Sequence, residues 1–313
     1  MAGVTGIGYV RYQAPDLDRM ETFLSDFGLI RAARTDTALY MRATGSEHHI
    51  HITELGEPSR GLGVGLRVDS REDLERIAQQ AGVAVVESDE VGGGVRAILT
   101  DPNGMRVDIV YGMKTVEPIT VRTPLVLNDS QRAPRLGLLQ RPTRGASHIA
   151  RLEHAVLEGP NFEAALEFYC GLLGMEVSDR MYQGDPKNTV VAFLHCGSGQ
   201  AYTDHHTIAI AKGPAGIHHC ALVVLDWDDL MLGHHHLKDR GYSHDWGVGR
   251  HIIGSEVFDY WWDPFGNRLE HCVDGDMVND QHQPDNFPFE DEVLAIWSPP
   301  PNPNPAITEV VAA

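Results

Sequence analysis

The chain has 313 residues, which is enough for two domains of ordinary size. Its formal charge is −19, from 25 basic and 44 acidic residues, and this excess of acid argues against nucleic acid or an anionic membrane as a partner. No apolar run is long enough to cross a bilayer, and the N-terminus lacks a signal-peptide pattern. The four cysteines have no CxxC spacing and lie in apolar segments, which favours free thiols and a cytoplasmic protein.

In chain order, four predicted helices follow one pattern. Each begins at an Asp or Asn that lies seven residues after a marked position in an apolar strand, and each ends near a glycine. The marked positions and their predicted caps are Tyr9 and Asp16, Leu62 and Asp69, His154 and Asn161, and His219 and Asp226. Several short strand patterns follow each helix. The chain therefore contains a fourfold internal repeat of one βαβββ module.

The second and fourth modules end in a similar turn. The stretch "TDPNGMRVD" ends at Asp108 and "WDPFGNRLE" ends at Glu270, and each acid lies seven residues after the turn aspartate. We therefore expect an N-terminal pair of modules over 1–115 and a C-terminal pair over 148–275. Residues 116–147 are expected to form a linker. Residues 276–313 form a proline-rich tail, whose last part, "SPPPNPNPAITEVVAA", is incompatible with regular structure.

These modules also predict the fold. A β-rich module with one helix cannot close a hydrophobic core by itself, so two modules must combine. The predicted fold is α+β, with four βαβββ modules paired into two half-open barrels, each around a cavity.

The two pairs of modules differ at their equivalent positions. The N-terminal pair has Tyr9, Leu62 and Asp108, whereas the C-terminal pair has His154, His219 and Glu270. Two histidines and one carboxylate on one face leave open positions on a metal ion, and this set suits non-haem Fe(II), with Mn(II) as the alternative. We therefore predict a metal site in the C-terminal pair and none in the N-terminal pair.

Other histidines are excluded as ligands by their positions. His218 precedes His219 in a strand and is expected to point to the opposite face, and His271 is excluded by the same alternation beside Glu270. The run "HHH" at 234–236 lies in the fourth predicted helix, where successive side chains fan around the axis and cannot chelate one ion. We expect that run to be solvated surface.

The hairpin that ends at Glu270 is expected to hold a second functional group. Asp263 to Gly266 suits a type I turn followed by a left-handed bulge glycine. That turn pairs Asp263 with Asn267 and so places Tyr260 directly across from Glu270, on the same face of the hairpin.

These features resemble the vicinal oxygen chelate superfamily and, within it, the type I extradiol ring-cleaving catechol dioxygenases. The similarity rests on Gly249-Arg250-His251, Phe258, Tyr260, Asp263-Pro264, Gly266, Glu270, "FLHC" (193–196), "DHHTIAIA" (204–211) and "IHHC" (217–220). The resemblance implies that His206 is the acid–base residue, that His251 bonds a substrate oxygen and that Tyr260 lies just outside the metal ligands.

The resemblance also implies a reaction in aromatic catabolism. Fe(II) and O2 would cleave a catechol or trihydroxybenzene beside its vicinal hydroxyls and give a muconic semialdehyde-type product. Relatives that cleave carboxylated catechols carry an arginine five residues before the histidine of "GRH", where this chain has Trp246. We therefore expect a neutral, substituted catechol as the substrate. The resemblance further implies a homo-oligomer, a tetramer or larger.

Two other functions stay open. One is a metal-dependent lyase or isomerase of the glyoxalase or epimerase type, although the "HHT" strand offers no obvious fourth ligand except His206 itself. The other is a metal-free small-molecule-binding protein, which would suit the N-terminal half alone. There, His49 is the counterpart of His206 and is expected to be a relic or a surface residue. Phe287, Phe289 and Trp297 of the tail could cover the opening of the site.

Overall fold

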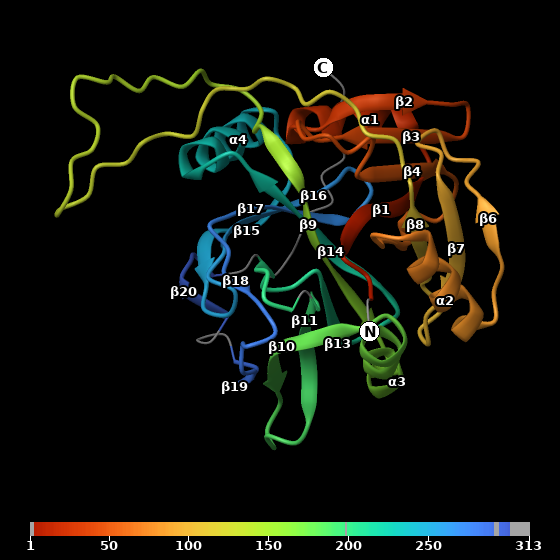
Figure 1. Ribbon diagram of the computed structural model, residues 1–313. Helices are drawn as coiled ribbons and strands as arrows, with labels where there is room; N and C mark the ends of the chain where they lie inside the picture. The colour runs from red at the N-terminus through yellow and green to blue at the C-terminus, as the bar shows by residue number, and fades with distance from the viewer. Residues whose placement is uncertain (1–2, 198, 291–293, 301–313) are drawn as a thin grey trace.

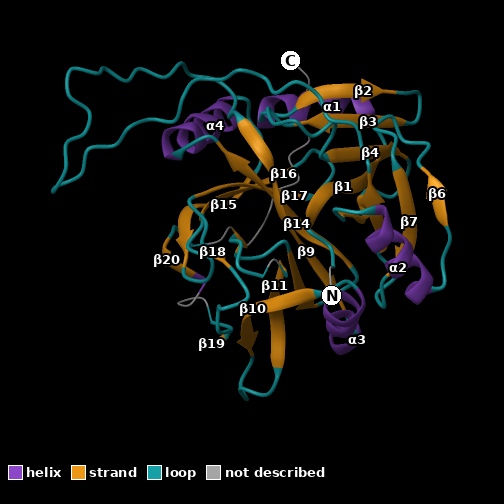
Figure 2. Cartoon of the chain, viewed as in Figure 1, coloured by secondary structure: helices purple, strands orange, loops and turns teal. Residues whose placement is uncertain are grey.

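The computed structural model describes residues 3–197, 199–290 and 294–300 (Figures 1 and 2). The N-terminal half contains, in chain order, β1 (Gly6–Ala14), α1 (Leu17–Phe27), β2 (Ile30–Arg34), β3 (Ala38–Arg42), β4 (His51–Leu55), β5 (Arg60–Arg67), α2 (Arg71–Ala81), β6 (Val85–Glu87), β7 (Val95–Thr100) and β8 (Arg106–Tyr111).

The C-terminal half repeats this order with a few additions. Its elements are β9 (Ile149–Gly159), α3 (Phe162–Glu167), a π-helical turn η1 (Phe168–Leu172), β10 (Met175–Tyr182), β11 (Thr189–Cys196), β12 (Thr203–Asp204), β13 (Ile208–Lys212), β14 (Gly216–Val224), α4 (Trp227–Asp239), β15 (His244–His251), β16 (Val257–Trp262) and β17 (Arg268–Val273). The strands β18 (Met277–Val278), β19 (Asp285–Pro288) and β20 (Ala295–Trp297) follow.

The strands of each half form one large mixed sheet with the same internal order. The N-terminal sheet runs β2-β3-β4-β1-β5-β8-β7-β6. The C-terminal sheet runs β10-β11-β13-β9-β14-β17-β16-β15, with β19 and β20 added at its two edges. Each sheet joins two βαβββ modules through its central antiparallel pair, β1 with β5 and β9 with β14. The predicted α+β fold of repeated modules is confirmed.

The helix caps explain where most helices begin. Asp16 accepts hydrogen bonds from the backbone at the start of α1, at 2.9 and 3.0 Å, and Asp226 does the same for α4 at 2.9 Å. Gly28 ends α1 in the left-handed conformation, with φ of 115°. Asn161 precedes α3 without a capping bond, and its side-chain amide donates to the carbonyl oxygen of Pro102.

The N-cap of α2 differs from the prediction, and this changes which residue of β5 is the counterpart of His219. Ser70, not Asp69, accepts the capping hydrogen bond, at 3.1 Å. Counting back seven residues then selects Gly63, and strand pairing agrees, because Gly63 lies opposite Arg11 as His219 lies opposite Val156. The counterpart of His219 is therefore Gly63, one residue after Leu62. A β-carbon at Gly63 would meet the backbone of β8, so this position has no room for a ligand side chain.

A hydrophobic core runs through both halves and joins them. Buried side chains from both sheets and from the helices belong to the same cluster, and α1 packs against α4. Polar groups also cross the junction: the Tyr169 hydroxyl donates to Asp101 at 3.3 Å. His271 stacks on Phe27 and contacts its carbonyl oxygen through Nε2 at 2.7 Å. His271 therefore faces the junction rather than the C-terminal cavity, as the alternation of β17 predicts.

Two of the α4 histidines are not solvated surface, contrary to the prediction. His234 lies 3.1 Å from both carboxylate oxygens of the fully buried Asp259, which also contacts His244 at 2.8 Å. His236 contacts Asp26 of α1 at 3.1 Å. The helical pattern could not show this, because the acids come from β16 and α1, which pack on either side of α4.

A long segment connects the two halves. Residues 116–147 contain no helix or strand and extend from the body as a long loop, yellow in Figure 1. Arg122 anchors this loop by pairing with Asp226 at 2.6 and 2.8 Å.

The prediction of free thiols is confirmed for all four cysteines, of which Cys170 is half-buried and the other three are buried.

The tail carries more structure than the sequence predicts. Its strands β19 and β20 pair with β10 and β15, at opposite edges of the C-terminal sheet. These strands are short, and their partners rather than their own residue pattern determine them. Residues 298–300 have no helix or strand. The remainder of the proline-rich end, 301–313, lies outside the described residues.

Candidate functional site

The three predicted metal ligands lie on three neighbouring strands of the C-terminal sheet. His154 is on β9, His219 on β14 and Glu270 on β17, and the register places Ala221 beside both His154 and Glu270. The Nε2 atoms of His154 and His219 lie 3.5 and 3.3 Å from Oε2 of Glu270. All three donor atoms lie within 4.8 Å of one another. The structure therefore brings the predicted set together around one point.

The burial of this set shows that it needs an additional partner. Glu270 is fully buried, yet neither of its carboxylate oxygens has a hydrogen-bond partner among the described residues. Burial opposes the ionisation of Glu270, but the adjacent imidazoles of His154 and His219 outweigh this effect and lower its pKa. Burial lowers the pKa of His219 to about 4, so this ring is neutral near pH 7. An ionised carboxylate and a neutral imidazole are the forms in which these groups bind a metal.

His218 lies on the cavity side, contrary to the prediction. A β-bulge interrupts the pairing of β14 between Ile217 and His219, so the alternation of faces fails at this point. The Nδ1 atoms of His218 and His219 are 2.6 Å apart, and Arg268 contacts Nε2 of His218 at 2.8 Å. His218 and Arg268 therefore line the cavity beside the metal ligands.

The hairpin register is confirmed. Asp263 donates its backbone N–H to Asn267 at 2.8 Å, Gly266 has φ of 87°, and Tyr260 lies directly across from Glu270. The turn therefore points tyrosine and glutamate to the same face, as its sequence predicts.

Tyr260 and His251 form a hydrogen-bonded pair at the cavity wall. Nε2 of His251 lies 2.9 Å from the Tyr260 hydroxyl, and Nδ1 lies 2.8 Å from the carbonyl oxygen of Leu294. Because a carbonyl only accepts, Nδ1 carries the hydrogen of the neutral ring and Nε2 accepts from the tyrosine. Burial lowers the pKa of His251 and raises that of Tyr260, so both groups are neutral near pH 7. Oε1 of Glu270 is 4.0 Å from His251, which places the pair next to the metal ligands.

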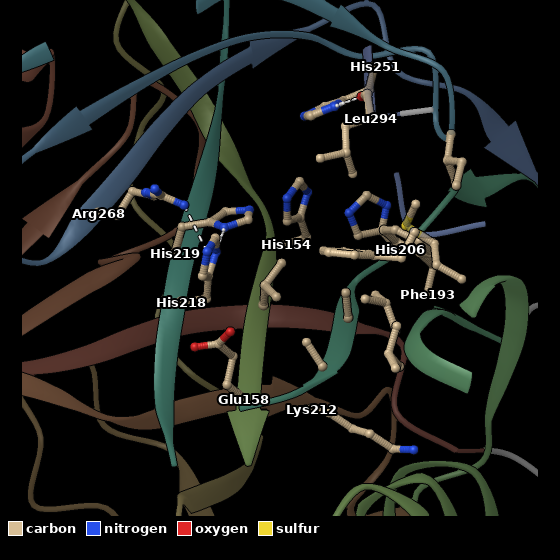
Figure 3. A pocket seen from close by; sticks show the side chains of 18 of the residues that line it. His154, Glu158, Phe193, His206, Lys212, His218, His219, His251, Arg268 and Leu294 are labelled. Carbon is tan, nitrogen blue, oxygen red and sulfur yellow. Dashed lines mark hydrogen bonds between the residues drawn. The ribbon is translucent and has the colours of Figure 1, made fainter. Parts of the chain in front are cut away.

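His206 lies on the other side of the ligand set. Its ring is 4.0 Å from the ring of His154, and Figure 3 shows the two side by side in the cavity. Burial lowers the pKa of His206 far below its usual value, so the ring is neutral and offers a lone pair near pH 7. The predicted acid–base residue therefore lies within reach of a molecule held at the ligand set.

Two buried acids near these residues were not predicted. Oε1 of Glu256 is 3.7 Å from Nδ1 of His206, and Oε2 of Glu153 is 3.6 Å from Nδ1 of His154. Burial and the nearby carboxylate of Glu153 raise the pKa of Glu256 well above its usual value. Glu256 directly precedes β16, and no local pattern in the sequence places it beside His206.

The ligand set opens into a cavity of about 520 Å3 along the inner face of the C-terminal sheet. Apart from the residues already described, its lining is mainly apolar and includes Val156, Met181, Val190, Val191, Phe193, Ala209, Ala211, Trp246, Ile253, Phe289 and Leu294. Glu158 points into the space below the histidines (Figure 3). Phe289 and Leu294 come from the tail, which therefore helps to close the cavity.

The equivalent point of the N-terminal sheet is filled by protein. The hydroxyl of Tyr9 donates to Asp108 at 2.6 Å, where the C-terminal half has the gap between His154 and Glu270. Arg106 and Arg11 also neutralise the charge of Asp108, at 2.8 and 3.6 Å. His49 is fully buried between tyrosine rings and is not a surface residue.

Comparison with known proteins agrees with this geometry. The sequence profile of the Glyoxalase/Bleomycin resistance protein/Dioxygenase superfamily matches residues 6–109 and 151–271. The chain is 32% identical to metapyrocatechase 2 of Cupriavidus necator over 88% of this chain and 82% of that protein. It is 28% identical to biphenyl-2,3-diol 1,2-dioxygenase of Metapseudomonas furukawaii over 86% of each chain.

Solved structures share the fold. The Mn(II)-bound glyoxalase from Novosphingobium aromaticivorans is 27% identical, with a TM-score of 0.77 over 95% of this chain and 91% of that one. The 2,3-dioxygenase LapB from Pseudomonas sp. KL28 also has a TM-score of 0.77, at 20% identity, over 92% of this chain and 99% of that one.

The chain belongs to the Glyoxalase/Bleomycin resistance protein/Dioxygenase superfamily. Within it, the chain is an extradiol ring-cleaving dioxygenase, the class predicted from its motifs, and enzymes of this class use a catalytic metal. In the described part of the chain, no helix is long and apolar enough to cross a membrane.

Proposed function

We propose that this enzyme uses non-haem Fe(II) and O2 to cleave a neutral, substituted catechol beside its vicinal hydroxyls, giving a muconic semialdehyde-type product. The observation that carries the proposal is the ligand set itself: two buried imidazoles and one buried carboxylate, with both carboxylate oxygens unpaired among the described residues, at the inner end of a mainly apolar cavity. Oε2 of Glu270 lies 3.5 Å from Nε2 of His154 and 3.3 Å from Nε2 of His219. These separations suit three ligand atoms that each lie about 2.0–2.2 Å from one ion. Two histidines and a carboxylate favour Fe(II), with Mn(II) as the alternative.

His154, His219 and Glu270 would hold the ion. A bound Fe(II) supplies one centre at which both oxygens of a catechol and O2 can be held together, which replaces an improbable encounter of three partners. His206 accepts a proton from the bound catechol and later returns it to the reacting oxygen. The neutral Tyr260 and His251 hold the substrate oxygens on the opposite side, where the Tyr260 oxygen, whose hydrogen goes to His251, accepts from a substrate hydroxyl.

The cavity supports a substrate larger than catechol itself. Its volume lies in the range that encloses drug-sized ligands, and the strands opposite the histidines offer mostly small aliphatic side chains. Trp246 stands where relatives acting on carboxylated catechols have an arginine. Two basic side chains line the cavity: Arg268 is paired with Asp245 at 2.7 Å, and Lys212 donates to the amide oxygen of Asn188 at 3.1 Å, so each already has a protein partner. A neutral ring substituent fits these surroundings.

The decisive experiment measures turnover directly. The protein is reconstituted anaerobically with Fe(II) or Mn(II), mixed with neutral and carboxylated catechols, and exposed to air while O2 uptake and the yellow ring-fission product are recorded. A parallel assay with a glyoxalase substrate, a thiol hemithioacetal of a 2-oxoaldehyde, tests the activity named for the Novosphingobium neighbour. Consumption of no catechol with either metal would refute the proposal. A cytoplasmic location and a homo-oligomeric state stay predictions.

A further inference from the structure

Behind His206, a row of buried polar side chains leads away from the cavity. Nδ1 of His206 lies 3.2 Å from Nδ1 of His205, whose Nε2 lies 3.0 Å from Oδ2 of Asp179. The backbone N–H of Asp285, on the tail strand β19, donates to Oδ1 of Asp179 at 2.7 Å. His205, His206 and Asp179 are all buried, and neither His205 nor Asp179 lines the cavity. None of the reaction steps above uses them.

The directions of these hydrogen bonds follow from the groups involved. A carboxylate only accepts, so the hydrogen of a neutral His205 ring is on Nε2, facing Asp179. The Nδ1 atom of His205 then has a lone pair and must receive a hydrogen from Nδ1 of His206. A neutral His206 therefore has its lone pair on Nε2, the nitrogen left for the cavity. Glu256, at 3.7 Å from Nδ1 of His206, is too distant to compete for that hydrogen.

The surrounding backbone holds His205 in place. Its N–H donates to the carbonyl oxygen of Asp276 at 2.9 Å, and its carbonyl oxygen accepts from the hydroxyl of Ser178. His282 contacts the carbonyl oxygen of Ser178 at 3.0 Å and lies 3.8 Å from Asp179. One contact with the tail and one with β10 therefore fix the backbone of His205, and His282 of the tail contacts the strand segment that carries Asp179.

The N-terminal half provides an internal comparison. His48 and His49 repeat the pair of adjacent rings, with their Nδ1 atoms 3.0 Å apart. However, the N-terminal counterpart of Asp179 is Ala33. Ala33 pairs with Tyr40 as Asp179 pairs with Phe193, and in both halves a β-bulge precedes this pair. The half that lacks the metal ligands therefore keeps the two histidines but has alanine, not a carboxylate, at the position equivalent to Asp179. The carboxylate is present only where His206 has a substrate to act on.

We propose that Asp179 and His205 are positioning residues that hold His206 with its Nε2 lone pair toward the substrate, ready to accept the proton of the catechol. This inference rests on the proposed function, because it concerns the residue that moves the proton there. Neither residue touches the substrate. Asp179 acts through His205, and His205 acts through His206.

The substitution Asp179→Asn tests this arrangement because the geometry predicts that it exchanges the tautomers of His205 and His206. An amide has one accepting oxygen, and the fixed backbone N–H of Asp285 takes it. The amide nitrogen then faces Nε2 of His205, so the hydrogen of that ring moves to Nδ1 and is donated to His206. His206 must then carry its own hydrogen on Nε2 and loses the lone pair that faces the cavity. The matched control is Asp285→Asn, which changes an exposed acid on β19 and leaves the backbone donor in place.

The readout is the tautomer of His206, measured by 15N–1H correlation spectra of the full-length chain loaded with diamagnetic Zn(II), with His206→Gln to assign the signals. We expect hydrogen on Nδ1 in the wild type and in Asp285→Asn, and on Nε2 in Asp179→Asn. In the Fe(II) enzyme, kcat of Asp179→Asn should fall by about 10- to 100-fold with KM within about twofold, a share of the usual effect of a general base.

Several results would overturn the proposal. They are a wild-type His206 with its hydrogen on Nε2, an unchanged tautomer in Asp179→Asn, or a control that shifts as the variant does. If Asp179→Asn does not fold, the wild-type spectrum alone decides. A wild-type enzyme that cleaves no catechol would refute the proposed function, whereas the tautomers would still be measurable, so the two failures can be distinguished.

Discussion

Replacing Glu270 by glutamine should abolish the part of the thermal stability that depends on metal. A metal that binds only the folded protein, at a free concentration 100 times its Kd, stabilises it by about 2.7 kcal/mol. For a unit of 150–250 residues this corresponds to about 5–11 °C in Tm. Glutamine keeps the shape of Glu270 but removes the anionic ligand of a site in which neither carboxylate oxygen has a hydrogen-bond partner in the part of the chain that the structure describes. The effect of chelator on Tm should fall below about 2 °C.

The assay is thermal unfolding followed by circular dichroism, under anaerobic conditions with excess Fe(II) or Mn(II), before and after addition of EDTA. Asp108→Asn is the matched control, because Asp108 occupies the equivalent position of the N-terminal sheet and bonds Tyr9 instead of a metal. That variant should keep the full response to EDTA. An equal response in Glu270→Gln and the wild type would refute the assignment of the metal site to His154, His219 and Glu270.

Three further predictions concern other residues. His206→Ala should lower kcat by about 10²- to 10⁴-fold while the metal content, measured by elemental analysis, stays at the wild-type level; loss of the metal would contradict the role of His206. Burial lowers the pKa of His51 to about 3, so below about pH 6.5 the unfolded chain binds a proton that the folded one does not, and acid destabilises the protein. Urea unfolding at pH 7.0 and 5.0 should therefore show a loss about 2 kcal/mol smaller in His51→Phe than in the wild type, and an identical loss would rule this out. Asp259→Ala leaves His234 and His244 without their buried acid and should cost about 3–5 kcal/mol in urea unfolding with the metal retained; a cost below 1 kcal/mol would disprove the structural role of this cluster.

Residues that follow a local rule could be predicted from the sequence. The turn chemistry of Asp263 to Gly266 correctly gave the register of Tyr260 and Glu270, and the spacing to the helix caps gave His154 and His219. The same rule failed by one residue at Leu62, because Ser70 competes with Asp69 for the cap of α2. Local rules cannot choose between two adjacent capping residues.

Features that depend on neighbours distant in sequence could not be predicted. The bulge that turns His218 into the cavity is a property of how β14 pairs with β9, not of the residues "IHHC". The partners of His234 and His236 lie on β16 and α1, and the carboxylate behind His205 lies 26 residues earlier, on β10. Each of these contacts forms only when separate elements pack together, so no pattern along the chain contains it.

The tail strands impose an order on the folding of this enzyme. The N-terminal sheet is complete at β8, before the linker has been synthesised, whereas the C-terminal sheet has both of its edges covered only by β19 and β20. Domains generally fold as units during synthesis, the N-terminal one first. Until the tail has been synthesised and has paired, β10 and β15 are open edges of the C-terminal sheet, and open edges can pair with other chains. The same late segment supplies the carbonyl of Leu294 that orients His251, so the edges of this sheet and the active site both depend on the last part of the chain to be made.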